Sequence, residues 1–305
     1  GYQRRISQVY STLGWYSWSV QEDYPRAQRY LADGLRLAEE LNDLRSLAFA
    51  NLYLGCVLSW NCEYEKASYH LGKVLDINKA ANSLWGIAAM KSWIACWVYN
   101  FQGKINLGFK ETYEAVQIAE ESGDIYSKAF SYAYHGHSCY CKGLLREAEE
   151  HLVKGINFCE HINDPAHQCV GYLWLGEIYL NMSKHIQARE FFEKGISVLE
   201  QHRIFPSGLN LCRLALALAK ISCGDVDIEL EPLYRYQAES RMKLWQGMMQ
   251  RYLSAILLNF DVKRLSDAED WIKRAIEDDT RNGTRFSLAE DFAHYGDCLL
   301  YTSDA

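Results

Sequence analysis

Small residues recur in this chain about every 40 positions. A first series has steps of 41, 41, 40 and 40 residues, and consists of Gly14, Gly55, Cys96, Gly136 and Gly176. A second series runs in phase with it at steps of 40 or 41 residues, and consists of Ala27, Ala67, Gly108, Ala148, Ala188, Ile228 and Ala268. A fixed period of this length is typical of one supersecondary unit stacked along the chain. The length of 305 residues therefore reflects the number of repeats rather than the number of globular domains.

The fifth repeat shows most clearly what one unit contains. Asp164 can cap a first helix, and Pro165 suits its first turn, where the missing N–H costs nothing. Gly176 lies on the apolar stripe of that helix, and Ala188 and Gly195 lie on the stripe of a second helix. A glycine inside a helix costs about 1 kcal/mol relative to alanine. We therefore expect these small residues where two helices approach closely.

The period predicts an all-α fold, a right-handed superhelical solenoid of about seven antiparallel helix pairs plus one unpaired C-terminal helix. The sixth unit is expected to be degenerate, because it has Ile228 in place of a small residue and also carries Gly224 and Pro232. A half repeat at the end and a first residue other than Met suggest a fragment of a larger protein. The single repeat domain, 1–305, divides into units at about 1–43, 44–83, 84–124, 125–164, 165–203, 204–243, 244–283 and 284–305.

Charge and composition narrow the classes of partner. The net charge is −7 and no block of Lys or Arg occurs, which argues against nucleic acid and against anionic membrane surfaces. No apolar run approaches the roughly 18–20 residues of a membrane helix. The ten cysteines stand singly in apolar patterns, which favours reduced core residues in a cytoplasmic protein.

The small and large positions of the units resemble those of tetratricopeptide repeats (TPRs). From the first-helix Gly to the second-helix Ala the spacing is 12 residues in units two, four and five, as in that family. The period of 40 implies longer helices or turns than the family's usual unit of about 34 residues. The residues that carry the resemblance are Leu175, Gly176, Tyr179, Ala188, Phe192 and Gly195 in unit five, with Leu54, Gly55, Tyr64 and Ala67 in unit two.

A narrower resemblance concerns the longer form of the repeat. Unit endings at residues 38–43 and 119–124 are similar to repeats in large bacterial signalling proteins, and residues 265–276 resemble the terminal repeats of that group. Those proteins couple a class III adenylate/guanylate cyclase or protein-kinase domain to a regulatory ATPase module, with the repeats at the C-terminal end. The resemblance implies attached signalling domains outside this chain.

Motifs for catalysis are missing from the sequence. Gly103-Lys104 lacks the earlier glycine and the hydroxyl residue of a phosphate-binding loop, and neither a G-x-S-x-G elbow nor an HExxH pair occurs. No acid/base pair or nucleophile–base set emerges from the pattern. We therefore expect no enzyme activity and no cofactor in this chain.

One cluster of histidines and cysteines has the spacing of metal ligands. His135 and Cys139, and likewise His137 and Cys141, are four residues apart and share a helix face, which gives two potential pairs on different sides. A closed site needs two more ligands on one side. The sequence offers Cys159 with His161 or Cys169, but no spacing demands that they approach. Core cysteines with partly exposed histidines are favoured, so no metal is expected.

The first series also predicts which residues face the inside of the superhelix. If its small residues contact the partner helix, the inner face lies three positions before them and one and four to five after them. Arrays of this type bind ligands on the concave face, and Trp and Tyr are favoured anchors. The alternative is that these aromatic rings only fill space between long helices. The candidate binding residues are Trp15, Trp18, Trp60, Trp93, Trp97, Asn100, His137, Tyr140, Glu177 and Asn181.

Two functions are compatible with these patterns. The first is a non-catalytic scaffold or regulatory module that binds a protein or peptide on its concave face within a signal-transduction protein. The alternative is a sensor arm that binds a small molecule and controls an attached cyclase or ATPase domain. A peptide groove predicts a continuous polar and aromatic strip, whereas a sensor predicts one closed cavity. A partner with basic or apolar side chains is expected over one that bears phosphate.

Overall fold

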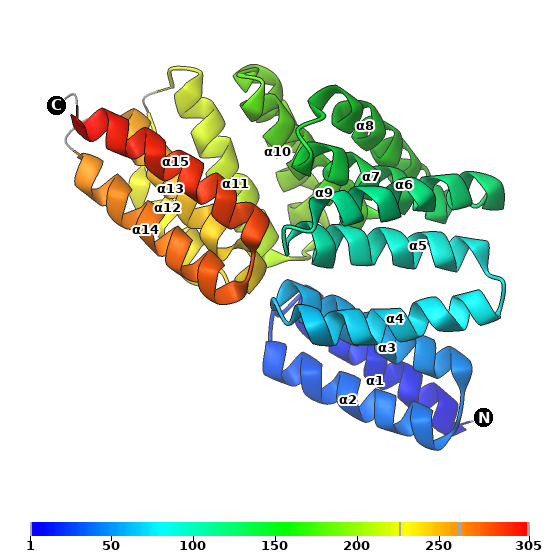
Figure 1. Ribbon diagram of the computed structural model, residues 1–305. Coiled ribbons are helices and arrows are strands. Elements are labelled where there is room, and N and C mark those ends of the chain that lie inside the picture. The colour runs from blue at the N-terminus through cyan, green and yellow to red at the C-terminus, as the bar shows by residue number, and fades with distance from the viewer. Residues whose placement is uncertain (1, 226, 261–263, 304–305) are drawn as a thin grey trace.

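The chain folds into consecutive pairs of antiparallel helices, as Figure 1 shows. The computed structural model describes residues 2–225, 227–260 and 264–303, and no strand occurs among them. The pairs are α1 (Tyr2–Ser19) with α2 (Tyr24–Glu40), α3 (Leu44–Trp60) with α4 (Tyr64–Ala80), α5 (Leu84–Ile94) and the π-helix η1 (Ala95–Asn100) with α6 (Ile105–Ser122), α7 (Ile125–Cys141) with α8 (Leu145–His161), α9 (Pro165–Asn181) with α10 (His185–His202), α11 (Pro206–Ser222) with α12 (Leu230–Glu239), and α13 (Gln246–Phe260) with α14 (Leu265–Asn282).

The last helix, α15 (Arg285–Ser303), has no second helix after it in the described residues, and a short 3₁₀ helix, η2 (Lys243–Trp245), precedes α13. The predicted solenoid of seven pairs and one unpaired helix is thereby confirmed. Residue 1 of the first unit and residues 304–305 of the half repeat lie outside the described residues. No described helix combines the length and the apolarity needed to cross a membrane.

Aspartates and asparagines set the boundaries between helices. The side chains of Asp43, Asp124 and Asp164 accept a backbone N–H in the first turn of α3, α7 and α9, which satisfies a donor that the helix itself leaves unpaired. Asn42 and Asn163, which precede two of these caps, have φ of 46° and 53°, a left-handed conformation that asparagine tolerates better than most residues. The turn residues of the sequence thus end one helix and start the next.

The first series of small residues lies where the two helices of a unit touch. A Cβ added there would lie 2.5 Å from Leu31 at Gly14, 2.5 Å from Leu71 at Gly55, 2.6 Å from Leu152 at Gly136 and 2.3 Å from Phe192 at Gly176. These distances are far below van der Waals contact, so any larger residue would force the neighbouring side chain to shift. At Gly195 an added Cβ would meet Tyr172 and Cys212 at 3.6 and 3.7 Å, which is ordinary contact, so glycine is not required there.

In unit three, the residue of the first series is larger than glycine, and the residue that it faces on the second helix is smaller than Leu or Phe. Cys96 stands in the series of glycines, and Thr112 stands where the other units have Leu or Phe. Both residues are fully buried. The first helix of this unit widens into η1 around Cys96, whereas the corresponding segments of units one, two, four and five are α-helical throughout. The smaller Thr112 leaves room beside α7, which matters for the histidine of that helix described below.

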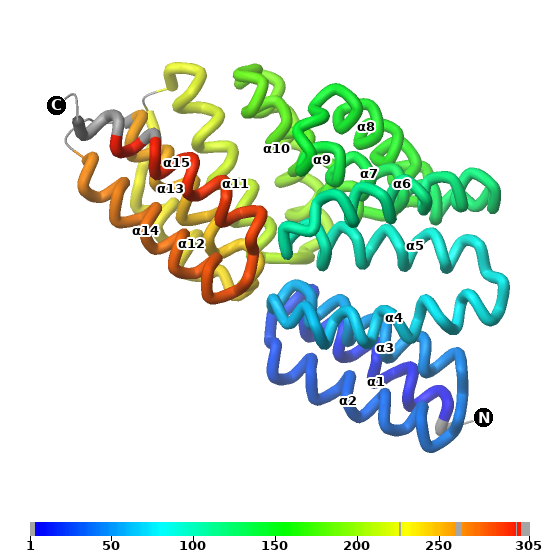
Figure 2. Tube along the Cα trace, viewed as in Figure 1, coloured from blue at the N-terminus to red at the C-terminus, as the bar shows by residue number. Residues whose placement is uncertain are grey.

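The array bends so far that distant units touch, as the chain path in Figure 2 shows. The N–H of Phe205, just before α11, donates to the carbonyl of Ser19 at the end of α1 (2.6 Å). Near the start of α15, the N–H of Phe286 donates to the carbonyl of Phe101, which follows η1 (3.3 Å). The C-terminal units therefore lie over the inner face of units three to five.

The sixth unit differs from the others in its second helix. α12 has 10 residues, whereas the second helices of the other six pairs have 17 or 18. Residues 223–225 and 227–229 between α11 and α12 are not helical, and Ile228 is only half-buried. Pro232 lies in the first turn of α12, where a proline is tolerated, and a helix that contains it cannot extend much further toward the N-terminus.

Candidate functional site: an aromatic cavity on the inner face

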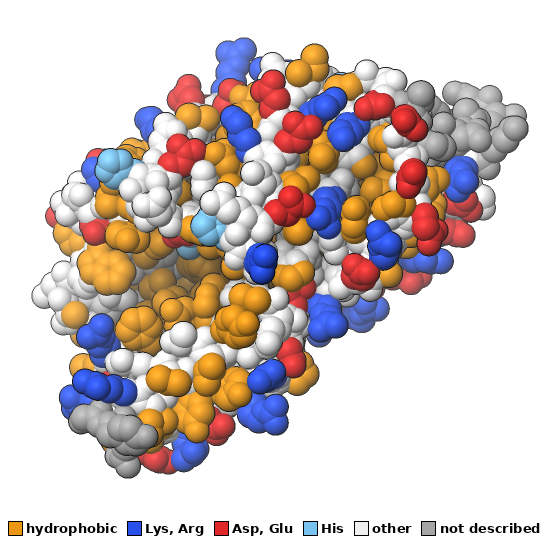
Figure 3. All heavy atoms as spheres, turned by 180° about the vertical axis from the view of Figure 1, so that it is seen from behind, with side chains coloured by type: hydrophobic (Ala, Val, Ile, Leu, Met, Phe, Trp, Pro, Cys, Tyr) orange, Lys and Arg blue, Asp and Glu red, His pale blue; other side chains and the backbone are white. Residues whose placement is uncertain are grey.

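A deep cavity of about 350 Å³ lies on the inner face, and we call it the inner cavity. Its walls come mainly from the first helices of five successive units, α1, α3, α5 with η1, α7 and α9. Further lining residues come from α10, from α11 and the segment that leads into it, and from the segment that precedes α13. Figure 3 shows a hollow in one face of the molecule with mainly hydrophobic walls. The aromatic lining residues are Trp15, Tyr53, Trp60, Trp93, Trp97, Phe130, Tyr134, Phe205 and Trp245.

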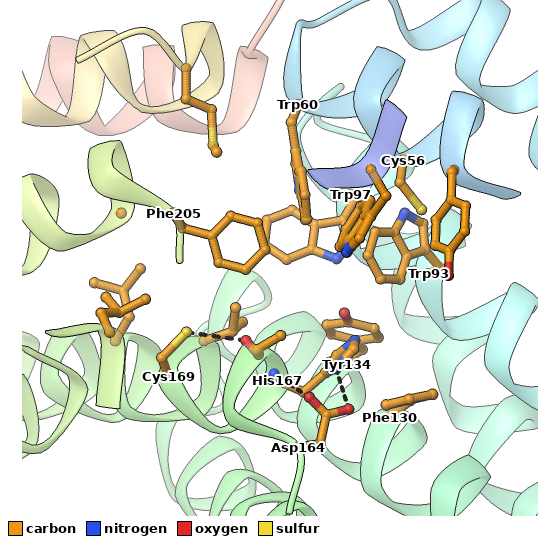
Figure 4. Close-up of a pocket in the computed structure, with 18 of the residues that line it drawn as sticks. Cys56, Trp60, Trp93, Trp97, Phe130, Tyr134, Asp164, His167, Cys169 and Phe205 are labelled. Atoms are coloured by element: carbon orange, nitrogen blue, oxygen red, sulfur yellow. Dashed lines mark hydrogen bonds and ion pairs between the residues drawn. The ribbon is translucent and has the colours of Figure 1, made fainter. Parts of the chain in front are cut away.

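The aromatic walls hold one another in place. The ring of Trp60 lies 5.6 Å from Trp93, 5.6 Å from Trp97 and 5.4 Å from Phe205 between centroids, the last two edge to face. Trp93 meets Tyr134 edge to face at 5.8 Å. In Figure 4, Trp60, Trp93 and Trp97 lie together on one side of Tyr134, and Trp97 meets the Tyr134 ring edge to face at 5.9 Å. Aromatic pairs in these geometries add to the energy of burial, so the walls are rigid before any ligand arrives.

Few polar groups line the inner cavity. Asp164 Oδ2 and Nδ1 of His167 are 2.8 Å apart, and the same carboxylate caps α9. Burial opposes ionisation of Asp164, but His167 and the backbone N–H groups outweigh it and lower the pKa of that carboxyl. The Nε1 donors of Trp60 and Trp93 are buried and have no hydrogen-bond partner among the described residues. No Lys or Arg is among the described residues that line the cavity.

Four of the ten residues that the sequence singled out line the inner cavity: Trp15, Trp60, Trp93 and Trp97. Trp18, the fifth aromatic ring of the N-terminal half, does not. It is fully buried between the two helices of unit one, where its ring meets Tyr24 edge to face at 5.9 Å. Trp18 is therefore placed to pack the first unit rather than to contact a ligand.

The other five candidates lie in a second region, which we call the covered layer. It consists of Asn100, His137, Tyr140, Glu177 and Asn181, together with Tyr252 of α13 and Glu290 of α15, which contact Glu177 and Tyr140. Asn100 and His137 are fully buried, and Asn100 Nδ2 donates to Ser138 Oγ at 2.9 Å. Asn181 is exposed, and its Nδ2 donates to the hydroxyl of Tyr140 at 3.2 Å. These side chains form hydrogen bonds with other residues of the chain. Their contact with a ligand stays a prediction.

Helices α13 and α15 cover this layer with complementary groups. The hydroxyl of Tyr252 donates to Glu177, and the hydroxyl of Tyr140 donates to Glu290 at 2.9 Å. Arg251 pairs with Glu290 at 2.8 Å and with the fully buried Asp291 at 2.6 Å. Burial raises the pKa of Glu177 to about 7, with the charge of Glu290 adding to it and the Tyr252 hydrogen bond and Arg251 opposing it.

Sequence reasoning missed part of the cavity wall, and for one group a signal was available. Met90, Phe130 and Val170 line the cavity, and each stands six residues before the small residue of its unit. They continue the predicted inner stripe by about one turn toward the N-terminus of each helix. Phe205 and Trp245 lie outside the long helices, so no periodic pattern marks them.

The two histidine–cysteine pairs of α7 have different surroundings. His137 lies between two sulfurs, with Nδ1 3.2 Å from Cys96 and Nε2 3.4 Å from Cys141. His135 and Cys139 instead join His151 of α8, and the ligand atoms of these three lie within 4.8 Å of one another. Both His135 and His137 are buried, so the expectation of partly exposed histidines is wrong. All ten cysteines are free thiols, seven of them buried.

Comparisons of the sequence with protein-family models and with curated proteins find no match. Comparison of the fold with solved structures finds many. A Rap protein complexed with competence and sporulation factor is 13% identical, with a TM-score of 0.60 over 92% of this chain and 85% of that one. The Rap conjugation gene regulator of plasmid pLS20, in complex with the Phr* peptide, is 13% identical, with a TM-score of 0.54 over 98% and 97%.

A third neighbour is longer than this chain. It is a signal transduction ATPase with numerous domains (STAND) from Pyrococcus horikoshii that carries a tetratricopeptide repeat sensor. It is 15% identical, with a TM-score of 0.54, and the match covers 99% of this chain but 54% of the neighbour, so the chain spans about half its length. At these identities the likeness concerns the fold. The chain is a tetratricopeptide-like helical-repeat array.

Proposed function

We propose that this chain is a non-catalytic regulatory module that binds a short peptide on its inner face, with an apolar or aromatic side chain of the peptide in the inner cavity. The observation that carries the proposal is the cavity itself, whose walls come mainly from the first helices of successive units. This is the concave surface that helical-repeat arrays use for binding.

The size and chemistry of the inner cavity define the ligand. A volume of about 350 Å³ lies at the lower end of the range for ligand pockets and suits one or two large side chains. The indole N–H groups of Trp60 and Trp93 are buried in the wall, so the tryptophans offer a ligand their apolar ring surfaces. Asp164, paired with His167, is the acidic group at the wall, and no Lys or Arg lines the cavity among the described residues. A neutral or basic peptide segment therefore fits better than a phosphate-bearing one.

The neighbours support a peptide and a place in signalling. One of them was solved with the Phr* peptide, and the STAND neighbour carries its repeats as a sensor. Together with the resemblance of residues 265–276 to repeats in cyclase- and kinase-linked ATPases, they support attached signalling domains in the full-length protein. A cytoplasmic location follows from that role and from the ten free cysteines.

A small apolar molecule is the second candidate, and the shape of the site favours it. The inner face does not present one continuous polar and aromatic strip, because α13 and α15 cover the polar part. What is left open among the described residues is the inner cavity. A small-molecule sensor predicts that arrangement, so both ligand classes are tested on the same variants.

Selection from a displayed random peptide library on the immobilised chain tests the proposal. We expect selected peptides to share a bulky apolar residue beside a basic one. Ala166→Phe places a ring in the cavity from the start of α9, and it should weaken binding of the selected peptides at least tenfold. Ala80→Phe, at the exposed end of α4, is the matched control and should leave binding unchanged.

Two results would decide against a peptide. If selected peptides bind the Ala166→Phe chain as well as the wild type, the cavity is not their site. If no peptide is enriched while a small-molecule library yields a ligand that Ala166→Phe excludes, the sensor function replaces the peptide function.

A further inference from the structure

Three metal-ligating side chains meet outside the inner cavity, between α7 and α8. His135 and Cys139 stand one turn apart on α7, and His151 of α8 faces them, with the ligand atoms of all three within 4.8 Å of one another. His135 and Cys139 are buried, whereas His151 is half-buried, so an ion could enter from the α8 side. Neither the proposed peptide site nor the covered layer includes these residues.

The hydrogen bonds of Thr112 fix the tautomer of His135. The Thr112 hydroxyl lies 3.0 Å from the carbonyl of Gly108 and 3.1 Å from that of Phe109, so it donates to a carbonyl. Nδ1 of His135 lies 2.9 Å from the same hydroxyl oxygen and must therefore donate its own proton to it. The lone pair of Nε2 then points toward Cys139. Histidines that bind metals use this arrangement, in which the second ring nitrogen donates to a fixed acceptor.

The partner helix supplies the other ligands. The rings of His135 and His151 lie 4.6 Å apart, and Nδ1 of His151 is buried without a hydrogen-bond partner among the described residues. Glu147 stands one turn before His151 on α8 and is exposed. Its charge acts on both Cys139 and His151. The pair His135 and Cys139 of α7 thus converges with His151 of α8. Glu147 is not part of that group, but it stands one turn from His151 at an exposed position from which its side chain can turn toward an ion.

The spacing matches a tetrahedral zinc site. Zn–N bonds of about 2.05 Å and Zn–S bonds of about 2.3 Å place a nitrogen and a sulfur about 3.6 Å apart at the tetrahedral angle. Nε2 of His135 and Sγ of Cys139 are 3.7 Å apart. The remaining separations, up to 4.8 Å, close to this value if the ring of His151 moves by about 1 Å.

We propose that His135, Cys139 and His151 bind a zinc ion, with the Glu147 carboxylate as the fourth ligand. Binding forms the Zn–S bond and releases the thiol proton of Cys139 to solvent, with no change of oxidation state. The ion joins the two helices of unit four at a half-buried position. Zinc binding therefore stabilises the unit that contributes Phe130 and Tyr134 to the inner cavity.

The neighbouring pair on α7 provides internal controls. Cys96 and Cys141 lie against opposite ring nitrogens of His137, so one metal ion cannot bind both sulfurs and that ring. Cys141 is two residues from Cys139 and belongs to the same helix, but its sulfur lies on the other side. Cys139→Ser and Cys141→Ser are therefore matched variants with opposite expected results.

Titration of the reduced, metal-free chain with Co²⁺, followed by displacement with Zn²⁺, tests the proposal. We expect saturation at one Co²⁺ per chain with a thiolate-to-cobalt charge-transfer band. Cys139→Ser should remove the band, and Cys141→Ser should retain it. Thr112→Val removes the acceptor of the His135 proton and should weaken Zn²⁺ binding by about 10- to 100-fold.

A second readout guards against variants that fail to fold. Zn²⁺ should raise the melting temperature of the wild type and of Cys141→Ser but not of His151→Ala, a substitution at a half-buried position, with helical circular dichroism as the check on folding. Absence of saturable Co²⁺ binding by the wild type overturns the proposal. A charge-transfer band that survives in Cys139→Ser, or equal zinc stabilisation of His151→Ala, also overturns it.

Discussion

The inner face of the array has two halves built from the same helix positions, and they differ in what lies on them. In the inner cavity, Trp60 and Trp93 border empty space and no lining cation is described. In the covered layer, Glu177 and Tyr140 are buried beneath α13 and α15. A repeat period predicts that both sets face inward, but the bend of the array decides which set a ligand can reach.

The side chains of each half suit what lies on that half: paired polar groups under α13 and α15, and apolar groups around the open cavity. Buried polar groups are costly unless they are paired, and α13 and α15 bring Tyr252, Arg251 and Glu290 as partners for Glu177 and Tyr140. The cavity half has mainly apolar walls, which need no partner and gain most from a ligand that displaces water. The C-terminal units thus occupy one half of the inner face, where a ligand would otherwise bind.

The largest expected effect concerns Arg251 in the covered layer. Arg251→Leu leaves the fully buried Asp291 without its cationic partner and should lower the free energy of unfolding by about 3–5 kcal/mol. Urea unfolding followed by circular dichroism measures this. Arg189→Leu breaks the exposed pair with Glu193 and is the control, with an expected cost below about 1 kcal/mol. Equal costs would mean that the cover is not an energetic part of the fold.

Glu177 makes stability depend on pH. Its pKa is about 7 in the folded protein and near 4.5 when unfolded, so folding takes up a proton between these values and stability falls as the pH rises through that window. Glu177→Gln should gain up to about 3 kcal/mol relative to the wild type between pH 5 and pH 8. Glu65→Gln, exposed on α4, should show no such gain. If the difference in unfolding free energy between Glu177→Gln and the wild type does not change with pH, the burial of this carboxyl is contradicted.

The smallest effect compares two helical glycines and tests the contact between helices that supports both halves. Gly176→Ala drives a methyl group into the ring of Phe192 and should cost about 1–3 kcal/mol. At Gly72 of α4 no atom lies within 4 Å of an added Cβ, so Gly72→Ala should stabilise by about 0.5–1 kcal/mol. Thermal melting should shift in opposite directions. Shifts of the same sign would show that the glycine series does not mark tight contacts.

The sequence predicts the fold well because a helix pair can bury its apolar faces only against its neighbours, which imposes the period directly. It predicts the cavity only in part. Trp93 and Trp97 follow from helical spacing, but Phe205 and Trp245 reach the cavity because the array bends, and the period does not encode that bend. His151 escaped notice for a similar reason, since only the packing of α8 on α7 brings it to Cys139.

Paired tryptophan variants of α5 test the central claim that the uncovered half of the inner face is the binding site. Trp93 lines the inner cavity, whereas Trp85, two turns earlier on the same helix, is 55% exposed and does not line it. Calorimetric titration with a selected peptide should give a dissociation constant at least tenfold larger for Trp93→Ala and unchanged for Trp85→Ala. The two variants should have equal helical circular dichroism. Equal affinities for Trp93→Ala and the wild type would contradict the account.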